Sequence, residues 1–346
     1  MNDRSHGRWP PLTYIWAAAF GIVAGLYLIQ FALQTGAAIF VVLLFGILFS
    51  LVLVYPINLL GRVMPRWLAA VLTLCLVLGL IALAVYVSMP FFVSQSQWLV
   101  AHVPLALERA QSWLHSLNVD GHPLPGSVKQ HLTAELGNLV KQALPVAFGA
   151  VSALGGMTAV LALSLFLAYD ADAYRRGILR LVPRASEHTL EQFLDRAGRV
   201  LQHWMVGQLL SMTVTGVLTG LGLLLLGINS WLVLGAIAFV LEFVPYIGPI
   251  LSAVPGVATG FAISPSMALW VLVVYVVVQL VESNVLQPLI MKRAIQLQPA
   301  LQLVWQLAMG SAFGILGLFI ATPLLACIQL AVEYFYIERT LEKPAS

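Results

Sequence analysis

Six long stretches of this sequence contain no Asp, Glu, Lys or Arg, and they determine the solvent in which the chain can fold. The stretches are Pro11–Leu60, Trp67–Gln97, Leu144–Tyr169, His203–Leu241, Phe243–Val281 and Pro299–Val332. A helix needs about 20 apolar residues to cross ~30 Å of hydrocarbon, so each stretch can supply at least one membrane span. Because the stretches are apolar on every helical face, a large soluble core does not explain them. The sequence predicts an all-α polytopic membrane protein.

Composition supports a membrane protein and excludes other classes. Hydrophobic residues make up 60% of the chain and charged residues 9%, whereas a soluble domain is about 25% charged. The net charge of +3 is too small, and the basic residues are too dispersed, to indicate a nucleic-acid partner. Cys75 and Cys327 lie in apolar stretches and have neither a disulfide framework nor metal-ligand spacing. The predicted partner is therefore the lipid bilayer.

Charged and Pro/Gly-rich segments divide the chain into about eight membrane segments with a small helical extramembrane region. The expected parts are 1–89, a cytoplasmic N-terminus with spans one to three; 90–145, an extracytoplasmic helical region; 146–169, span four; 170–203, a cytoplasmic Arg-rich helical linker; 204–336, a C-terminal transport core; and 337–346, a cytoplasmic tail. Lys and Arg near span ends mark the cytoplasmic side. We therefore expect a multi-pass protein with both termini in the cytoplasm.

The last apolar stretches have two possible arrangements in the membrane. If residues 231–263 cross once, Lys292 and Arg293 lie outside, against the positive-inside tendency. If this stretch turns back at Pro245–Pro249, each arm has about 14 residues, or ~20 Å, and reaches only the middle of the membrane. Residues 299–336 can likewise turn back near Gly314–Gly317. The charges favour two re-entrant hairpins over two crossings.

Glu242 is the principal candidate for function because it interrupts an apolar stretch and precedes a helix-breaking run. The run contains Pro245, Tyr246, Gly248 and Pro249. Carboxylates at membrane depth rarely face lipid and usually line a cavity or a path for solute or ions. Transporters place substrate and ion sites at helix breaks of this kind. The structural alternative is a carboxyl that caps backbone amides freed by the break.

A second set of candidates lies on the following helix and at the last break. Its members are Gln279, Glu282, Asn284, Gln287 and Pro288 on the helix, and Gly314, Gly317 and Pro323 at the break. Polar side chains at steps of four give the helix a stripe that a lipid-facing helix would lack, with interhelical hydrogen bonding as the alternative. A hairpin tip would free backbone groups that can bind a cation or a polar solute, with a plain kink as the alternative.

The sequence lacks the common catalytic motifs. Gly-x-Ser-x-Gly, His-Glu-x-x-His and a phosphate loop ending in Gly-Lys-Ser/Thr do not occur. The histidines between positions 102 and 131 fit no metal motif. We predict no enzymatic activity, no cofactor and no metal, and without a phosphate loop we expect transport that ATP does not drive directly. Glycine pairs four residues apart predict close helix packing and suggest a homo-oligomer.

Three C-terminal motifs carry a resemblance to a known family. They are Leu241–Pro249 (LEFVPYIGP), Glu282–Pro288 (ESNVLQP) and Gly314–Ala326 (GILGLFIATPLLA), and the tract Phe166–Asp170 (FLAYD) fits the same pattern. With these motifs the chain resembles the autoinducer-2 exporter family of bacterial permeases, also called PerM-like proteins, over nearly its whole length. One departure is Met291, because family members often have Gly before the basic residue that follows the Gln-Pro motif.

The resemblance implies a multi-spanning protein of the bacterial inner membrane. Family activities include export of the quorum-sensing furanosyl signal autoinducer-2 and, in some members, sodium or potassium/proton antiport. We therefore expect a secondary transporter that exports a small polar, signal-like solute. One alternative is a monovalent cation/proton antiporter, with Glu242 and Glu282 as its protonatable groups. Another is a non-transporting membrane scaffold or regulator.

Overall fold

A computed structural model of the protein describes residues 39–116, 157–290 and 298–341, together with Gly36, residues 118–119 and 122–123, and scattered positions from 131 to 149. These residues are almost entirely helical, apart from a small antiparallel sheet of β1 (Asn118–Val119) and β2 (His122–Pro123). The expected helical class is therefore confirmed. The expected first span, at residues 12–31, lies outside the described residues.

The helices are listed here in chain order. A helix over Ile39–Leu60 comes first, followed by α2 (Arg66–Ser116), α4 (Met157–Tyr169), α5 (Ala171–Leu179), α6 (Arg184–Leu225), α7 (Trp231–Leu241), α8 (Ile247–Ile263), α9 (Pro265–Val281), η1 (Glu282–Leu286), α10 (Gln287–Ile290), α11 (Pro299–Ala331) and η3 (Val332–Leu341). Among the described residues, 5 helices are long and apolar enough to cross a membrane, and other apolar helices are shorter.

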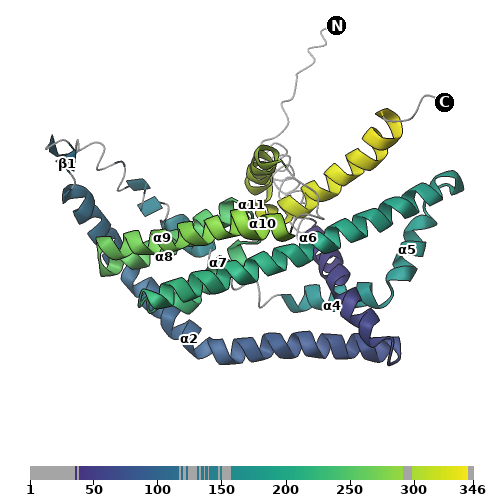
Figure 1. Cartoon of the computed structure of the whole chain (residues 1–346), viewed down its shortest axis with the longest axis horizontal. Helices are drawn as coiled ribbons and strands as arrows, with labels where there is room; N and C mark the ends of the chain where they lie inside the picture. Colours follow the sequence, from purple (N-terminus) through teal and green to yellow (C-terminus); the bar gives the residue numbers. More distant parts are fainter. Residues whose placement is uncertain are drawn as a thin grey trace, which may run out of the picture.

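Helix α2 continues past residue 89, where the third span was expected to end. It contains Pro90 and Pro104 and bends without stopping, so its two arms lie at an angle (Figure 1). A proline removes one backbone hydrogen bond, which bends a helix whose neighbouring turns remain intact. At 1.5 Å per residue, its 51 residues extend for about 75 Å, more than twice the thickness of the hydrocarbon. Part of α2 must therefore lie outside the hydrocarbon.

Helices α6 to α9 form a ring of four. Contacts join α6 to α7, α7 to α8, α8 to α9, and α9 back to α6. Glycines bring neighbouring backbones close: Gly216 lies against Phe239, and Gly220 lies against Trp231, so α6 and α7 run antiparallel. This glycine pair packs two helices of the same chain, and it therefore does not indicate a second subunit.

Helix α11 folds back on itself at Gly314, which has φ 61° and ψ −143°. Trp305 Nε1 donates to the carbonyl of Ala321 at 2.9 Å. Gln302 and Gln306 both donate to Thr322 Oγ1, at 3.3 and 3.2 Å. Residues 16 positions apart would be about 24 Å apart in a straight helix. The two arms on either side of Gly314 therefore form a helical hairpin.

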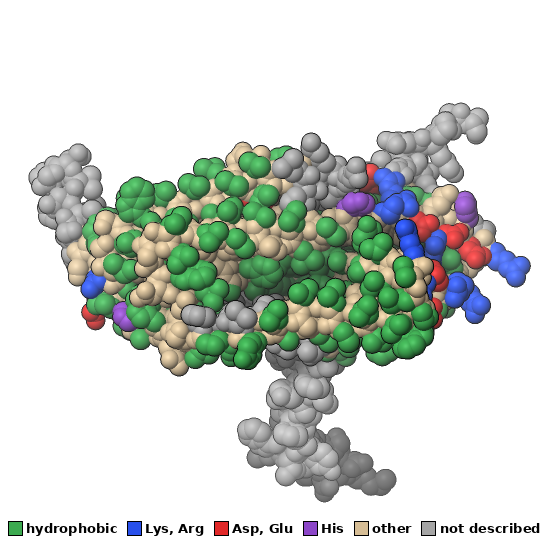
Figure 2. Space-filling view, turned by 60° about the horizontal axis from the view of Figure 1, so that its bottom comes forward, with side chains coloured by type: hydrophobic (Ala, Val, Ile, Leu, Met, Phe, Trp, Pro, Cys, Tyr) green, Lys and Arg blue, Asp and Glu red, His purple; other side chains and the backbone are tan. Residues whose placement is uncertain are grey.

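The surface separates apolar from charged regions. Figure 2 shows a face that is mostly apolar and hollowed at its centre, with charged side chains gathered at one end. Helix α5 and the beginning of α6 form this end, where Arg175 pairs with Glu191 at 3.0 Å and with Asp195 at 2.9 Å. Arg196 of α6 pairs with Glu333 of η3 at 3.2 Å. Apolar sides and a charged end fit a protein embedded in a bilayer.

Candidate functional site

The chain turns sharply between α7 and α8. The amide of Ile247 donates to the carbonyl of Pro245 at 2.8 Å, which closes a three-residue γ-turn around Tyr246. Tyr246 has φ 66° and ψ −52°, a conformation that is rare and strained for a residue with a side chain. Such strain, of order 1–3 kcal/mol, persists only where surrounding contacts impose it, and it concentrates at functional sites.

Gly248 allows the two helices to meet at this turn. Its amide donates to the carbonyl of Val244 at 2.8 Å, and a Cβ here would lie 1.9 Å from the carbonyl oxygen of Leu241. Pro249 follows in the first turn of α8, where a missing amide proton leaves no helical hydrogen bond unmade. The predicted residues Pro245, Gly248 and Pro249 thus shape the backbone of the break.

Glu242 directly follows α7, and its side chain is only 4% exposed. Its backbone carbonyl accepts a hydrogen bond from Gln208 Nε2 of α6 at 2.7 Å. Carboxyl oxygen Oε2 has no hydrogen-bond partner among the residues that the structure describes. The side chain is therefore buried with an unused acceptor, although burying such a group without a partner is costly.

Glu282 is also 4% exposed, but its carboxyl is surrounded by donors. Oε1 accepts from Gln287 Nε2 at 3.1 Å, and Oε2 accepts from Gln279 Nε2 at 3.1 Å and from Ser283 Oγ at 3.4 Å. Glu282 begins the π-helical segment η1. A π-turn relates residues five apart, which places Gln287 over Glu282, and such turns are frequent at functional sites.

The inner face of α9 directs Glu282 into the protein. Ala268, Val271, Tyr275 and Val278 are buried at steps of three and four residues, and Glu282 continues the same face. Electrostatic interactions link Glu282 with both Glu242 and Tyr246. The α7–α8 break and the polar end of α9 are therefore one site.

The second helix break lies beside the first. Phe243, next to Glu242, stacks on Phe319 of α11 with ring centroids 5.7 Å apart and ring planes at 14°. Trp204 of α6 and Phe45 of the preceding helix also contact Phe243, at 5.9 and 5.3 Å between centroids. Aromatic contacts therefore connect the break after α7 with the second arm of the α11 hairpin.

Two glycines shape the α11 hairpin, and only one of them is buried. A Cβ on Gly317 would lie 2.0 Å from the carbonyl oxygen of Met309, so a side chain there would separate the arms. Gly314 is exposed at the turn itself. Pro323 is buried in the second arm, beside the Thr322 hydroxyl that receives both glutamines.

Some predicted residues lie away from this group. Asn284 and Pro288 are exposed, and Asn284 Nδ2 donates to the carbonyl of Leu280 in its own helix at 2.9 Å. Sequence reasoning missed Gln208, Phe243 and Phe319. Gln208 could have been noticed as a polar residue in an uncharged stretch, whereas the two phenylalanines have no sequence signal that separates them from ordinary core residues.

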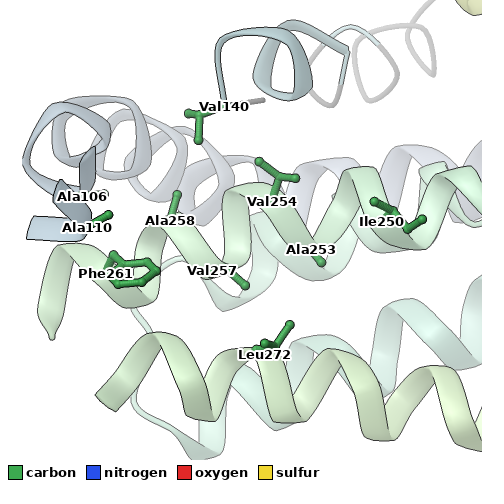
Figure 3. A pocket seen from close by; sticks show the side chains of 10 residues that line it. All are labelled: Ala106, Ala110, Val140, Ile250, Ala253, Val254, Val257, Ala258, Phe261 and Leu272. Atoms are coloured by element: carbon green, nitrogen blue, oxygen red, sulfur yellow. The ribbon is translucent and has the colours of Figure 1, made fainter. Parts of the chain in front are cut away.

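The structure also contains an apolar cavity of about 230 Å³ between α2, α8 and α9. Figure 3 shows its lining, which consists of Ala106, Ala110, Val140, Ile250, Ala253, Val254, Val257, Ala258, Phe261 and Leu272. None of the predicted site residues lines it, and it offers no side chain suited to a polar solute. Within the described parts of the chain, no three His, Cys, Asp or Glu side chains are grouped to hold a metal ion.

Comparison with known proteins identifies the family. Residues 17–337 match the family described as AI-2E family transporter. The chain belongs to this family. The AI-2E family is made up of transport proteins and permeases, so this protein is a membrane transport protein with several helices suited to spanning the bilayer.

Relatives of this AI-2E family member cover most of its length at modest identity. "Putative transport protein YrrI" of Bacillus subtilis is 27% identical over 315 residues, which cover 87% of this chain and 88% of that protein. "Putative permease PerM" of Escherichia coli is 23% identical, with 78% of each chain covered. "AI-2 transport protein TqsA" of Escherichia coli is 29% identical over 141 residues, which cover 40% of this chain and 41% of TqsA.

Proposed function

We propose that this AI-2E family member is a secondary transporter that exports a small polar, signal-like solute across the bacterial inner membrane. The observation that carries the proposal is the meeting of two helix breaks beside two buried carboxyls, Glu242 and Glu282. Secondary transporters hold solutes at broken helices lined by such groups. The name of the partial relative TqsA supports a solute like AI-2.

The two carboxyls would serve different purposes in this transporter. Three side-chain donors hold Glu282 in one orientation. Glu242 has an oxygen that the described residues do not use, so it can accept a hydrogen bond from a hydroxyl of the solute. The strained turn at Tyr246 would let the break change shape as the solute passes.

The membrane arrangement is part of the proposal. Residues 231–263 and 299–336 would be re-entrant hairpins that enter from the outside and the cytoplasm respectively, with 90–145 outside and 170–203 and both termini in the cytoplasm. Helix α7 has 11 residues, about 16 Å, and is too short to cross. The charged end formed by α5 and α6 supports the orientation. A cysteine at Lys292 that is labelled only from the external face would contradict it.

The decisive experiment measures export by inverted membrane vesicles that contain wild-type protein or Glu242→Gln. Uptake of autoinducer-2 is followed together with Na⁺, K⁺ and proton flux. The variant keeps the size of the side chain but replaces an acceptor oxygen with an amide donor, so we expect uptake of the solute to fall at least about tenfold, equivalent to ~1.4 kcal/mol. Glu108→Gln on α2 is the control, because Glu108 is exposed and distant in sequence from the breaks.

Other outcomes would favour the alternative functions. Cation-coupled proton flux that Glu242→Gln abolishes, without uptake of autoinducer-2, would replace the exporter with an antiporter. A wild-type protein that moves neither the solute nor cations would favour a scaffold or regulator. Equal uptake by wild type and Glu242→Gln would remove Glu242 from the transport path.

A further inference from the structure

Four polar side chains form a stripe along α6, and we name it the α6 stripe. Its members are Gln208, Ser211, Thr215 and Thr219, all buried. Successive residues of a helix turn by about 100°. On this count the stripe points between Gly216, which packs on α7, and Gly222, which packs on Val274 of α9. The α6 stripe therefore faces the inside of the α6–α9 ring.

The opposite face of α6 is exposed and apolar, as expected for a surface in contact with lipid. It carries Val206, Leu210, Val217, Leu221 and Leu224. Thr213 also lies on this side and is exposed. The α6 stripe is thus on the side of the helix furthest from lipid, where an apolar side chain would be expected to pack.

The hydroxyls of the stripe lack the hydrogen bonds that such groups normally make. Ser211, Thr215 and Thr219 are 2%, 6% and 0% exposed, and none of their oxygens has a partner among the described residues. Helical Ser and Thr often donate to the carbonyl four residues earlier, as Thr213 does to Leu209 at 2.7 Å. The three stripe hydroxyls do not.

Two further unpartnered oxygens lie on the inner sides of the neighbouring elements. One is Glu242 Oε2, and Gln208 at the start of the stripe donates to the backbone carbonyl of the same residue. The other is Tyr275 Oη, on the inner face of α9. Buried polar groups are almost always hydrogen-bonded to protein or to ordered water. A row of such groups in one helical register therefore indicates a polar occupant.

We propose that the α6 stripe binds a file of water molecules that conducts protons between Glu242 and the end of α6 near Thr219. Ser211 and Thr219 are eight residues apart, about 12 Å, a distance that about four hydrogen-bonded waters span at ~2.8 Å each. Each water or hydroxyl accepts one proton and passes on another. The last proton converts the Glu242 carboxylate into a carboxyl, and the reverse sequence releases it.

This file deepens the proposed function, because it gives the transport carboxyl its own proton connection. It also explains why three hydroxyls lie on the innermost side of α6, where leucine or valine would otherwise fill the space. Buried water is stable where it finds two to four polar partners. The stripe hydroxyls, Tyr275 Oη and Glu242 Oε2 supply such partners along one path.

Silver ions test whether water reaches the stripe. In full-length protein with Cys75→Ser and Cys327→Ser, single cysteines replace Ser211, Thr215 or Thr219, and Thr213→Cys is the control facing lipid. Reconstituted protein is treated with Ag⁺, then unfolded and alkylated with a maleimide. Thiolates form where water reaches them, so we expect Ag⁺ to block later alkylation at the three stripe positions at least about tenfold faster than at position 213.

A second variant keeps the test decisive if a cysteine disturbs folding. If water occupies the stripe, Thr215→Val removes a bonded hydroxyl and leaves the melting temperature unchanged or lower. A raised melting temperature in Thr215→Val, or stripe cysteines that react no faster than Thr213→Cys, would overturn the proposal. Neither measurement depends on transport, so rapid labelling with no solute or cation flux would contradict the transporter and leave the water file standing.

Discussion

At the scale of single residues, the two buried carboxyls differ in what surrounds them. Glu282 receives three hydrogen bonds from its own helical region, whereas Glu242 Oε2 receives none from the described residues. A fully bonded carboxyl is fixed in place, while one with an unused acceptor can bind a further group. This difference makes Glu242 the better candidate for direct contact with a solute.

Gly248 provides a residue-scale prediction about the α7–α8 turn. A Cβ at this position would lie 1.9 Å from the Leu241 carbonyl oxygen, which belongs to the backbone and cannot rotate away. We expect Gly248→Ala to lower the free energy of unfolding by about 3 kcal/mol through overpacking and backbone displacement. Thermal unfolding in detergent measures the change.

Gly79 is the matched control for this substitution. A Cβ there would meet nothing within 4 Å, and the residue lies inside α2. Gly79→Ala should therefore be neutral or stabilising by up to ~1 kcal/mol, because alanine favours helix over glycine. Equal melting temperatures of Gly248→Ala and wild type would show that the turn is looser than described.

At the scale of elements, the α11 hairpin depends on one hydroxyl shared between its arms. Thr322 Oγ1 accepts from Gln302 and Gln306, and both glutamines are almost fully buried. The sequence showed glycines near positions 314 and 317 that could turn the chain. It did not show that Thr322 would hold the arms together, because the contact joins residues far apart along the chain.

Thr322→Val tests this link between the arms. The valine has a similar shape but leaves two buried amide groups without an acceptor, so we expect a loss of about 1–3 kcal/mol in the free energy of unfolding. Thr213→Val, on the exposed side of α6, should change it by less than about 0.5 kcal/mol. Comparable melting temperatures for the two variants would mean that the glutamines find other partners.

At the scale of the whole molecule, the long helix α2 holds the ends of α7 and α8. Gln95 Oε1 accepts from the amides of Leu232 and Val233 at 3.0 and 3.2 Å, at the start of α7. Arg109 donates to the carbonyls of Ala262 and Ile263, at the end of α8. Both contacts satisfy helix-end groups that have no partner within their own helices.

Removing the arginine should loosen the end of α8. In Arg109→Met the apolar stem is retained, but the carbonyls of Ala262 and Ile263 lose their donor. We expect faster hydrogen–deuterium exchange over the last turn of α8, measured by mass spectrometry, with little change in α7. Arg66→Met is the control, because Arg66 makes only a 3.9 Å ion pair with Asp172 and both side chains are exposed.

The sequence by itself determined the solvent, the helical class and the positions of the breaks. Charge-free stretches of this length fit only a membrane interior, and Pro245, Gly248 and Gly314 interrupt helices wherever they occur. These properties are local, so they can be read from neighbouring residues. The motifs around Glu242 and Glu282 likewise sufficed to indicate the family that the comparison confirmed.

Only the tertiary structure decided which of these features meet. The stacking of Phe243 on Phe319, the bond from Gln208 to Glu242, and the inward direction of Thr215 depend on how distant segments pack. Apolar stretches carry almost the same pattern on every face, so periodicity cannot tell the side of α6 that faces lipid from the side that faces the ring. Packing between helices makes that distinction, and it places the polar groups where the solute and water would pass.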